Sequence, residues 1–282
     1  MDRFFHLKFP LHLVVLLQFL TLLFFALESS AAYAQAEKQA MDAFQAAVTA
    51  EKPAAPACPC PDEKEKKSDD WELGLSFGFN MSKGNADTRL LAAGINANRE
   101  KDNNIYKLVF SGAEGEQESV TNQRFVRGDA SYDRLVTERT YLGIGTTFLS
   151  DDIADVDYRT ISNLSAGYFL LKDDDLKFSI ETGPAYVFEK QGGVKDNFFA
   201  WRFGNDFSWQ FSESGKIFQR AAFLLNTDDT NDYLLIAKAG VEAALNSWLS
   251  LVFAIEDRFD NSPAPTAKKN DVLITSSLKV SF

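Results

Sequence analysis

One segment of the sequence carries the residue pattern of a nucleophilic serine. Gly74, Ser76 and Gly78 fit G-x-S-x-G, which in α/β-hydrolases places the serine on a sharp turn between a strand and a helix. That chemistry also needs a histidine to accept the serine proton. The two histidines, His6 and His12, both lie in an N-terminal segment that we expect to be removed. We therefore expect no catalytic residue and no enzymatic activity.

The two cysteines have a spacing that metal and redox sites use. Cys58 and Cys60 form a C-x-C pair, which holds a soft metal ion or a redox couple when further ligands are present. The sequence offers no third cysteine, and its histidines lie in the segment to be removed. A local or intermolecular disulfide, or two inert thiols, is the favoured interpretation. We expect no metal site and no cofactor.

Acidic side chains gather in two segments that we expect to be loops, residues 151–157 and 228–232. Oxygen-rich clusters can bind Ca²⁺, but neither segment has the glycine and terminal glutamate of an EF-hand loop. Solvated acidic loops are the favoured interpretation. Divalent ions that bridge these loops to lipopolysaccharide are the alternative.

A further set of charged residues alternates with large apolar residues. The set comprises Glu72, Arg202, Asp206, Lys238, Glu242, Glu256 and Arg258. Successive side chains of a strand point to opposite faces, so these charges share the face opposite to the apolar one. In a closed barrel they would line the lumen, where charges of both signs can conduct ions or small solutes. They can also close the lumen through salt bridges, and the pattern alone leaves both possibilities open.

The N-terminal residues have the three parts of a secretory signal. Arg3 and Lys8 precede an apolar run at residues 11–27, and Ala-x-Ala sites follow within residues 32–36. This order is typical of a cleaved signal peptide. We predict a signal peptide at residues 1–34 and export of the chain; a permanent helical anchor is the alternative.

Residues 35–70 differ in composition from the rest of the chain. Met41, Phe44 and Val48 have helical spacing, which predicts a short amphipathic helix at residues 37–52. This helix could contact a periplasmic partner, plug a barrel or pack on nothing permanent. The Pro-Ala-rich and charge-rich residues that follow cannot bury enough apolar surface to fold, so we predict a periplasmic linker.

From residue 71 onward the apolar residues have a period of two. Trp71, Leu73 and Leu75 begin this pattern and residues 271–282 repeat it. Ten further segments alternate in the same way, near residues 88–98, 105–114, 123–135, 140–149, 158–171, 176–190, 197–210, 216–226, 233–245 and 248–260. We predict about twelve strands, an even number as in bacterial single-chain barrels.

The expected connections alternate in length along the chain. Residues 137–139, 172–175, 212–215 and 246–247 predict tight turns, whereas residues 82–87, 115–122, 150–157, 191–196, 227–232 and 261–270 predict longer loops. Short periplasmic turns and longer extracellular loops are typical of outer-membrane barrels.

The aromatic residues indicate which face of the strands meets lipid. Phe199, Trp201 and Phe203 alternate with smaller or polar residues such as Arg202. These rings are too bulky to share an interior with charged side chains, so we expect them to face the bilayer. The predicted fold is all-β, a transmembrane antiparallel up-and-down β-barrel at residues 71–282 in the bacterial outer membrane, surrounded by lipid and lipopolysaccharide. The net charge of −11 argues against a nucleic-acid partner.

Three short motifs resemble a known family. They are residues 82–88 (SKGNADT), residues 183–186 (GPAY), and residues 256–260 (EDRFD) followed by Pro263, Lys268, Lys269, Asn270 and Asp271. Their order and spacing are similar to those of the salt-induced outer-membrane proteins, domain-of-unknown-function family 481. The resemblance covers residues 71–282 and implies a barrel in the outer membrane, without an established substrate. Phe282 is similar to the C-terminal aromatic residue that the barrel assembly machinery recognises.

These observations lead to two expectations for function. The first is a narrow, non-enzymatic channel for ions or small solutes linked to the osmotic or salt response. The second is a structural or interaction barrel that supports the envelope through its periplasmic N-terminal segment.

Overall fold

The structure, a computed structural model, describes residues 71–83, 87–265 and 267–282 of the chain. They form twelve strands: β1 (Glu72–Ser82), β2 (Thr88–Lys101), β3 (Asn104–Gln117), β4 (Val120–Leu135), β5 (Thr140–Asp151), β6 (Val156–Lys172), β7 (Leu176–Gln191), β8 (Val194–Ser212), β9 (Gly215–Asn226), β10 (Tyr233–Ala244), β11 (Leu249–Asp260) and β12 (Asn270–Ser281). The predictions for residues 1–70, which include the signal peptide, the helix, the linker and both cysteines, lie outside the described residues.

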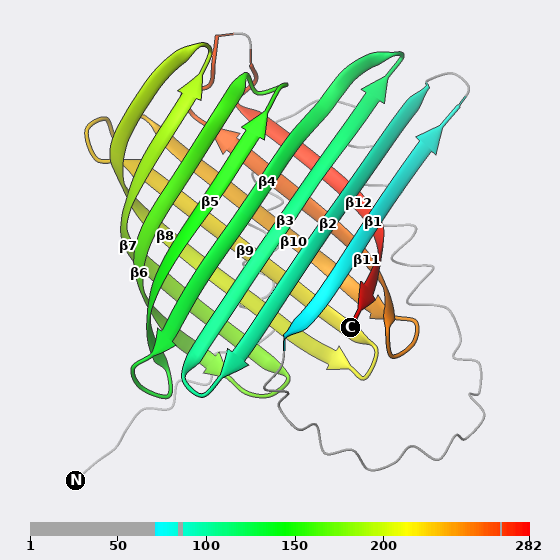
Figure 1. The fold of residues 1–282 in the computed structure, drawn as a ribbon, viewed down its shortest axis with the longest axis vertical. Helices are drawn as coiled ribbons and strands as arrows, with labels where there is room; N and C mark the ends of the chain where they lie inside the picture. The colour runs from blue at the N-terminus through cyan, green and yellow to red at the C-terminus, as the bar shows by residue number, and fades with distance from the viewer. Residues whose placement is uncertain (1–70, 84–86, 266) are drawn as a thin grey trace. The chain divides into compact units, whose positions relative to one another are not determined.

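The strands close into one antiparallel barrel (Figure 1). Each strand pairs with its neighbours in sequence, and β1 pairs with β12 to close the ring. Closure lets backbone groups bond within the wall, which hydrocarbon surroundings require. The prediction of a transmembrane all-β barrel of about twelve strands is confirmed. We call the end that holds Glu72 and Ser281 the terminal end, and the opposite end the loop end.

Two of the predicted long loops at the loop end are wrong. β3 and β4 are joined by Glu118 and Ser119 alone, and β7 and β8 by Gly192 and Gly193 alone. Their φ angles are 50°, 66°, 58° and 76°, respectively. Two successive residues with positive φ are typical of a type I′ hairpin, whose twist matches that of the flanking strands. The strands on this side of the barrel are therefore longer than the sequence pattern predicted.

Large apolar side chains cover the outer face of the barrel. Phe77 is 66% exposed and Phe199 is 63% exposed, and similar side chains stand out from nearly every strand. Such a surface would be unfavourable in water and is typical of the lipid-facing band of a transmembrane barrel. The part of the chain described by the structure contains no helix long and apolar enough to cross a membrane.

Two apolar clusters lie inside the barrel. The wall cluster comes from β6 to β10 and consists of Ile161, Ala185, Val187, Phe198, Ala200, Leu224 and Leu234. The seam cluster consists of Ala113, Phe125 and Leu273, against which Leu90, Ala92 and Leu149 pack. It joins β12 to β2, β3, β4 and β5, and therefore lies behind the place where the ring closes.

The closing pair of strands has the shortest ladder of the barrel. β1 and β12 share five registered residue pairs, from Gly74 opposite Ser281 to Gly78 opposite Ser277. Each of the other neighbouring pairs has eleven or more, for example β1 with β2 from Glu72 to Ser82. We call the β1–β12 junction the seam.

Candidate functional site in the barrel lumen

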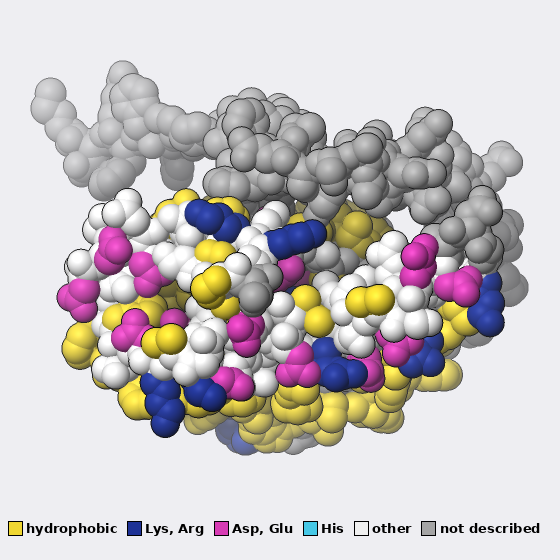
Figure 2. Space-filling view, turned by 90° about the horizontal axis from the view of Figure 1, so that it is seen from above, with side chains coloured by type: hydrophobic (Ala, Val, Ile, Leu, Met, Phe, Trp, Pro, Cys, Tyr) yellow, Lys and Arg dark blue, Asp and Glu magenta, His cyan; other side chains and the backbone are white. Residues whose placement is uncertain are grey.

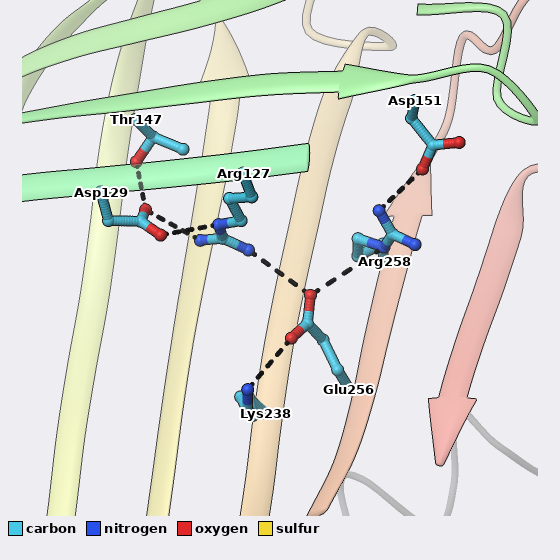
Figure 3. Close-up of polar contacts among 7 residues, drawn as sticks. All are labelled: Arg127, Asp129, Thr147, Asp151, Lys238, Glu256 and Arg258. Carbon is cyan, nitrogen blue, oxygen red and sulfur yellow. Dashed lines mark hydrogen bonds and ion pairs between the residues drawn. The ribbon is translucent and has the colours of Figure 1, made fainter. Parts of the chain in front are cut away.

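An ion-pair network crosses the lumen near the loop end (Figure 3). We call it the upper bridge: Arg127, Asp129, Thr147, Asp151, Lys238, Glu256 and Arg258. Arg258 Nη1 of β11 lies 2.8 Å from Asp151 Oδ2 of β5, and Arg127 Nη1 of β4 lies 3.5 Å from Glu256 Oε1 of β11. These strands are not neighbours in the wall. The two contacts therefore join opposite sides of the barrel.

The other members of the upper bridge hold these cross-lumen groups in place. Arg127 Nε donates to Asp129 Oδ2 at 2.9 Å, and Thr147 Oγ1 donates to Asp129 Oδ1 at 2.7 Å. Lys238 Nζ lies 3.5 Å from Glu256 Oε2. Positive and negative groups alternate along the network, so each cation faces a carboxylate.

A second cross-lumen contact lies beside the upper bridge. Arg159 of β6 donates to Glu189 of β7, to Gln191 Oε1 at 3.0 Å, and to Asp260 Oδ2 of β11 at 2.9 Å. Gln191 Nε2 also donates to Asp260 Oδ2 at 3.2 Å. Arg159 thus bonds with both walls and narrows the same level of the lumen.

The upper bridge is most buried at the pair formed by Arg258 and Asp151, whereas Lys238 at its other end is 48% exposed. The Arg258 side chain is 11% exposed and that of Asp151 is 4% exposed. Asp151 Oδ1 also accepts hydrogen bonds from the backbone N–H groups of Ile153 and Ala154, both at 3.1 Å. The Arg258 guanidinium lies 4.5 Å from the centre of the Phe125 ring, in the seam cluster. Ion pairs in such low-dielectric surroundings interact strongly and are screened little by salt.

The lumen nearer the terminal end is charged but open to water. Lys107 of β3 lies 3.6 Å from Asp206 of β8, and Arg220 Nη2 lies 2.7 Å from the same carboxylate. The Arg220 side chain is 54% exposed and that of Lys107 is 36% exposed. A cavity of about 130 Å³ lies here, lined by Lys107, Asp206 and Tyr141 among others. The cavity at the upper bridge measures about 50 Å³, room for very few water molecules.

Figure 2 looks onto the loop end and shows the types of side chain on this surface. Acidic, basic and hydrophobic side chains are mixed on this end, and hydrophobic side chains predominate along the outer wall at the lower edge of the view. The described residues bring together no group of three or more His, Cys, Asp or Glu side chains that could hold a metal ion. At the upper bridge and nearer the terminal end, a solute in the lumen would meet charged groups of both signs.

The structure brings three of the seven sequence-predicted charges together and distributes the others. Lys238, Glu256 and Arg258 belong to the upper bridge. Asp206 belongs to the group nearer the terminal end. Three further members lie apart from these groups: Arg202 donates to Glu181 Oε1 at 2.6 Å, Lys279 donates to Glu242 Oε1 at 3.0 Å, and Glu72 is exposed at the first residue of β1.

Sequence reasoning missed several charges of the lumen: Arg127, Asp129, Asp151, Arg159, Glu189 and Asp260. Asp151 was expected in an acidic loop but ends β5, and its contact with Arg258 explains why it is buried. Arg127 and Asp129 have the same phase as the buried Phe125. That alternation was a usable signal for their inward position. Ser76 of the G-x-S-x-G pattern lies within β1, where its Oγ donates to the Gly94 carbonyl at 3.4 Å.

Comparison with known proteins gives one family and several similar folds. The model of a protein family of unknown function, DUF481, matches residues 75–282. No curated protein matches the chain. Similar solved structures include the NanC porin (10% identity, 74% of this chain and 97% of that chain, TM-score 0.43) and the KdgM porin (10%, 75% and 99%, 0.41). A third is the translocator domain of the autotransporter NalP from Neisseria meningitidis (12%, 89% and 96%, 0.42).

Proposed function

The chain belongs to family DUF481, a protein family of unknown function. We propose that it forms a narrow, non-enzymatic channel for ions or small solutes. The observation that carries this proposal is the contrast along the lumen. Charges nearer the terminal end are exposed to water, whereas the Arg258–Asp151 pair of the upper bridge is buried. A hydrated, charge-lined passage that ends at a set of ion pairs has the form of a channel with a closed gate.

The chemistry of the upper bridge supports a gate over a permanent seal. Replacing a buried ion pair by apolar side chains of similar volume is often neutral or stabilising by about 1–4 kcal/mol. A barrel that only had to be sealed could therefore be filled as well by leucine and phenylalanine. Ion pairs such as Arg258–Asp151 can instead separate and be rehydrated when the lumen opens.

The proposed place of the channel is the bacterial outer membrane. The apolar outer face fits a bilayer, and lipopolysaccharide would surround the loop end. Export would use the signal peptide at residues 1–34, and the assembly machinery would recognise Phe282, which is 72% exposed at the terminal end. A link to the osmotic or salt response belongs to the same proposal.

Planar-bilayer recording of the refolded chain without residues 1–34 tests the proposal. We expect discrete conductance steps, and Arg202→Glu should shift the ion selectivity towards cations because it reverses an inward charge. Lys195→Glu is the matched control, since Lys195 is exposed and has the outward phase of β8. A folded barrel that stays electrically silent, or one in which both variants shift the selectivity equally, would contradict the proposal.

The second candidate function is a structural barrel that supports the envelope through its N-terminal segment. The contacts from Lys107 to Asp206 and from Lys177 to Glu100 favour it, because they cross the lumen at a second level. Deletion of residues 37–70 separates the two functions. A channel keeps its conductance after this deletion, whereas a tether loses its envelope phenotype although the barrel still assembles.

A further inference from the structure

The seam is paired over only part of its length. Beyond Gly78 and Ser277, no registered pair among the described residues joins β1 to β12. Both strands nevertheless continue towards the loop end, β1 as far as Ser82 and β12 from Asn270. A strand rises about 3.3 Å per residue, so the seven residues from Asn270 to Ser276 span roughly 20 Å along β12.

Exposure along β1 agrees with a separation of the two strands. Asn80 and Ser82 have the inward phase of Gly74 and Gly78, yet both are exposed, whereas the two glycines are buried. Phe79 and Met81, on the outward face, are 59% and 60% exposed and so belong to the apolar band. The separated part of the seam therefore lies at the depth of hydrocarbon, where an unsatisfied backbone group costs several kcal/mol.

The lumen behind this part of the seam is apolar. Leu273 lies on the segment of β12 without a registered β1 partner, and it is 8% exposed. It belongs to the seam cluster with Phe125 and Ala113, against which Leu90 and Ala92 of β2 pack. The cluster is therefore a packed apolar part of the lumen next to the separated strands, and its members are buried.

We propose that the loop-end halves of β1 and β12 form a lateral slit through which an acyl chain of an outer-leaflet lipid reaches the seam cluster. The chemistry of the slit selects this occupant. Among the residues unpaired across the seam, 79–82 of β1 and 270–276 of β12, the one charge is that of Asp271 at the loop end of β12, and the uncharged remainder suits a hydrocarbon chain. On β1 the residues unpaired across the seam, 79–82, span about 13 Å along the strand, which fits within one leaflet, about 15 Å of a 30 Å hydrocarbon core. Conduction along the barrel axis does not depend on this lateral path.

The wall cluster provides an internal control. It lies inside the same barrel, but each neighbouring pair of strands from β6 to β10 has eleven or more registered pairs, for example from Tyr233 to Ala243 between β9 and β10. A lipid that enters through the seam should reach Leu273 and Phe125 but not Val187 or Leu224.

The test is photolabelling of the folded chain in liposomes that contain a phospholipid with a diazirine on its acyl chain. After irradiation, mass spectrometry locates the labelled residues. We expect label on Phe125 and Leu273 at least five times above that on Val187 and Leu224. Label confined to outward residues, or equal label on both clusters, would overturn the proposal.

A disulfide across the seam tests the route. Continuing the register beyond Gly78 and Ser277 places Asn80 opposite Thr275. We expect the variant Asn80→Cys/Thr275→Cys, made in a Cys58→Ser/Cys60→Ser background, to lose the seam-cluster label when oxidised and to regain it when reduced. Unchanged label in the oxidised variant refutes the slit. If no disulfide forms, the comparison of the label on the two clusters decides by itself.

Discussion

Replacing Arg258 by methionine should open the proposed gate. The substitution keeps an unbranched side chain but removes the charge that lies 2.8 Å from Asp151 across the lumen. A hydrogen bond between charged groups contributes about 1.5–3 kcal/mol. If this contact is lost when the lumen opens, its removal raises the ratio of open to closed channels roughly 10-fold to 150-fold.

Single-channel recording measures this ratio directly as the open probability. Asp151→Asn should have a similar effect, because asparagine still accepts hydrogen bonds from Ile153 and Ala154 while the charge is lost. The double variant Arg258→Met/Asp151→Asn should open no more often than either single variant, since both remove the same contact. Heat-modifiable migration in electrophoresis would confirm that each barrel is folded.

Arg220→Met is the matched control for this experiment. Arg220 pairs with Asp206 at 2.7 Å, but the two residues lie on neighbouring strands and are partly exposed. Its loss should alter selectivity and leave the open probability within about two-fold. The reasoning is refuted if Arg258→Met opens no more often than the unmodified chain, or if its effect adds fully to that of Asp151→Asn.

Three further predictions concern the barrel wall and its assembly. Gly183→Ala should prevent a stable barrel, because the new Cβ would lie 2.1 Å from the Leu164 carbonyl oxygen. Gly128→Ala is the control: its Cβ meets only a side-chain atom at 3.6 Å, so the temperature at which the barrel shows heat-modified migration should not change. Val187→Thr should lower the free energy of unfolding in urea by about 1–3 kcal/mol, since a hydroxyl would enter a fully buried position; an unchanged unfolding midpoint would contradict the packing described for the wall cluster. Phe282→Ala should reduce the yield of assembled barrel in cells but not refolding in detergent, and equal yields in cells would rule out a role of the exposed ring in recognition.

The sequence predicts the strands of this barrel better than the side-chain contacts inside its lumen. Alternation such as that of Trp71, Leu73 and Leu75 indicates both the strand and its lipid-facing side, because the period of a strand is two. The prediction failed at the β3–β4 and β7–β8 hairpins. Gly192 and Gly193 were a usable turn signal that was interpreted as a longer loop. Glu118 and Ser119 adopt the same turn without any glycine, so the residue types at these positions could not have indicated a two-residue turn.

The cross-lumen contacts could not be predicted from spacing. Arg258 and Asp151 lie on opposite walls, and which residues meet there depends on the tilt and stagger of all the strands between them. A shift of two residues along one wall would keep every inward side chain inward but would change each partner. Periodicity can therefore indicate that Arg258 points inward, while its contact with Asp151 requires the three-dimensional structure.

The short ladder of the seam also has a consequence for the order of folding. Every other pair of neighbouring strands is adjacent in sequence, so those hairpins can form through local contacts at a small entropic cost. β1 and β12 must instead meet from opposite ends of the barrel sequence, and they gain five residue pairs when they do. Contacts between distant segments slow folding. Ring closure at the seam is therefore expected to be the last and slowest step, and in hydrogen exchange the amides at the loop end of β1 should be among the first to exchange.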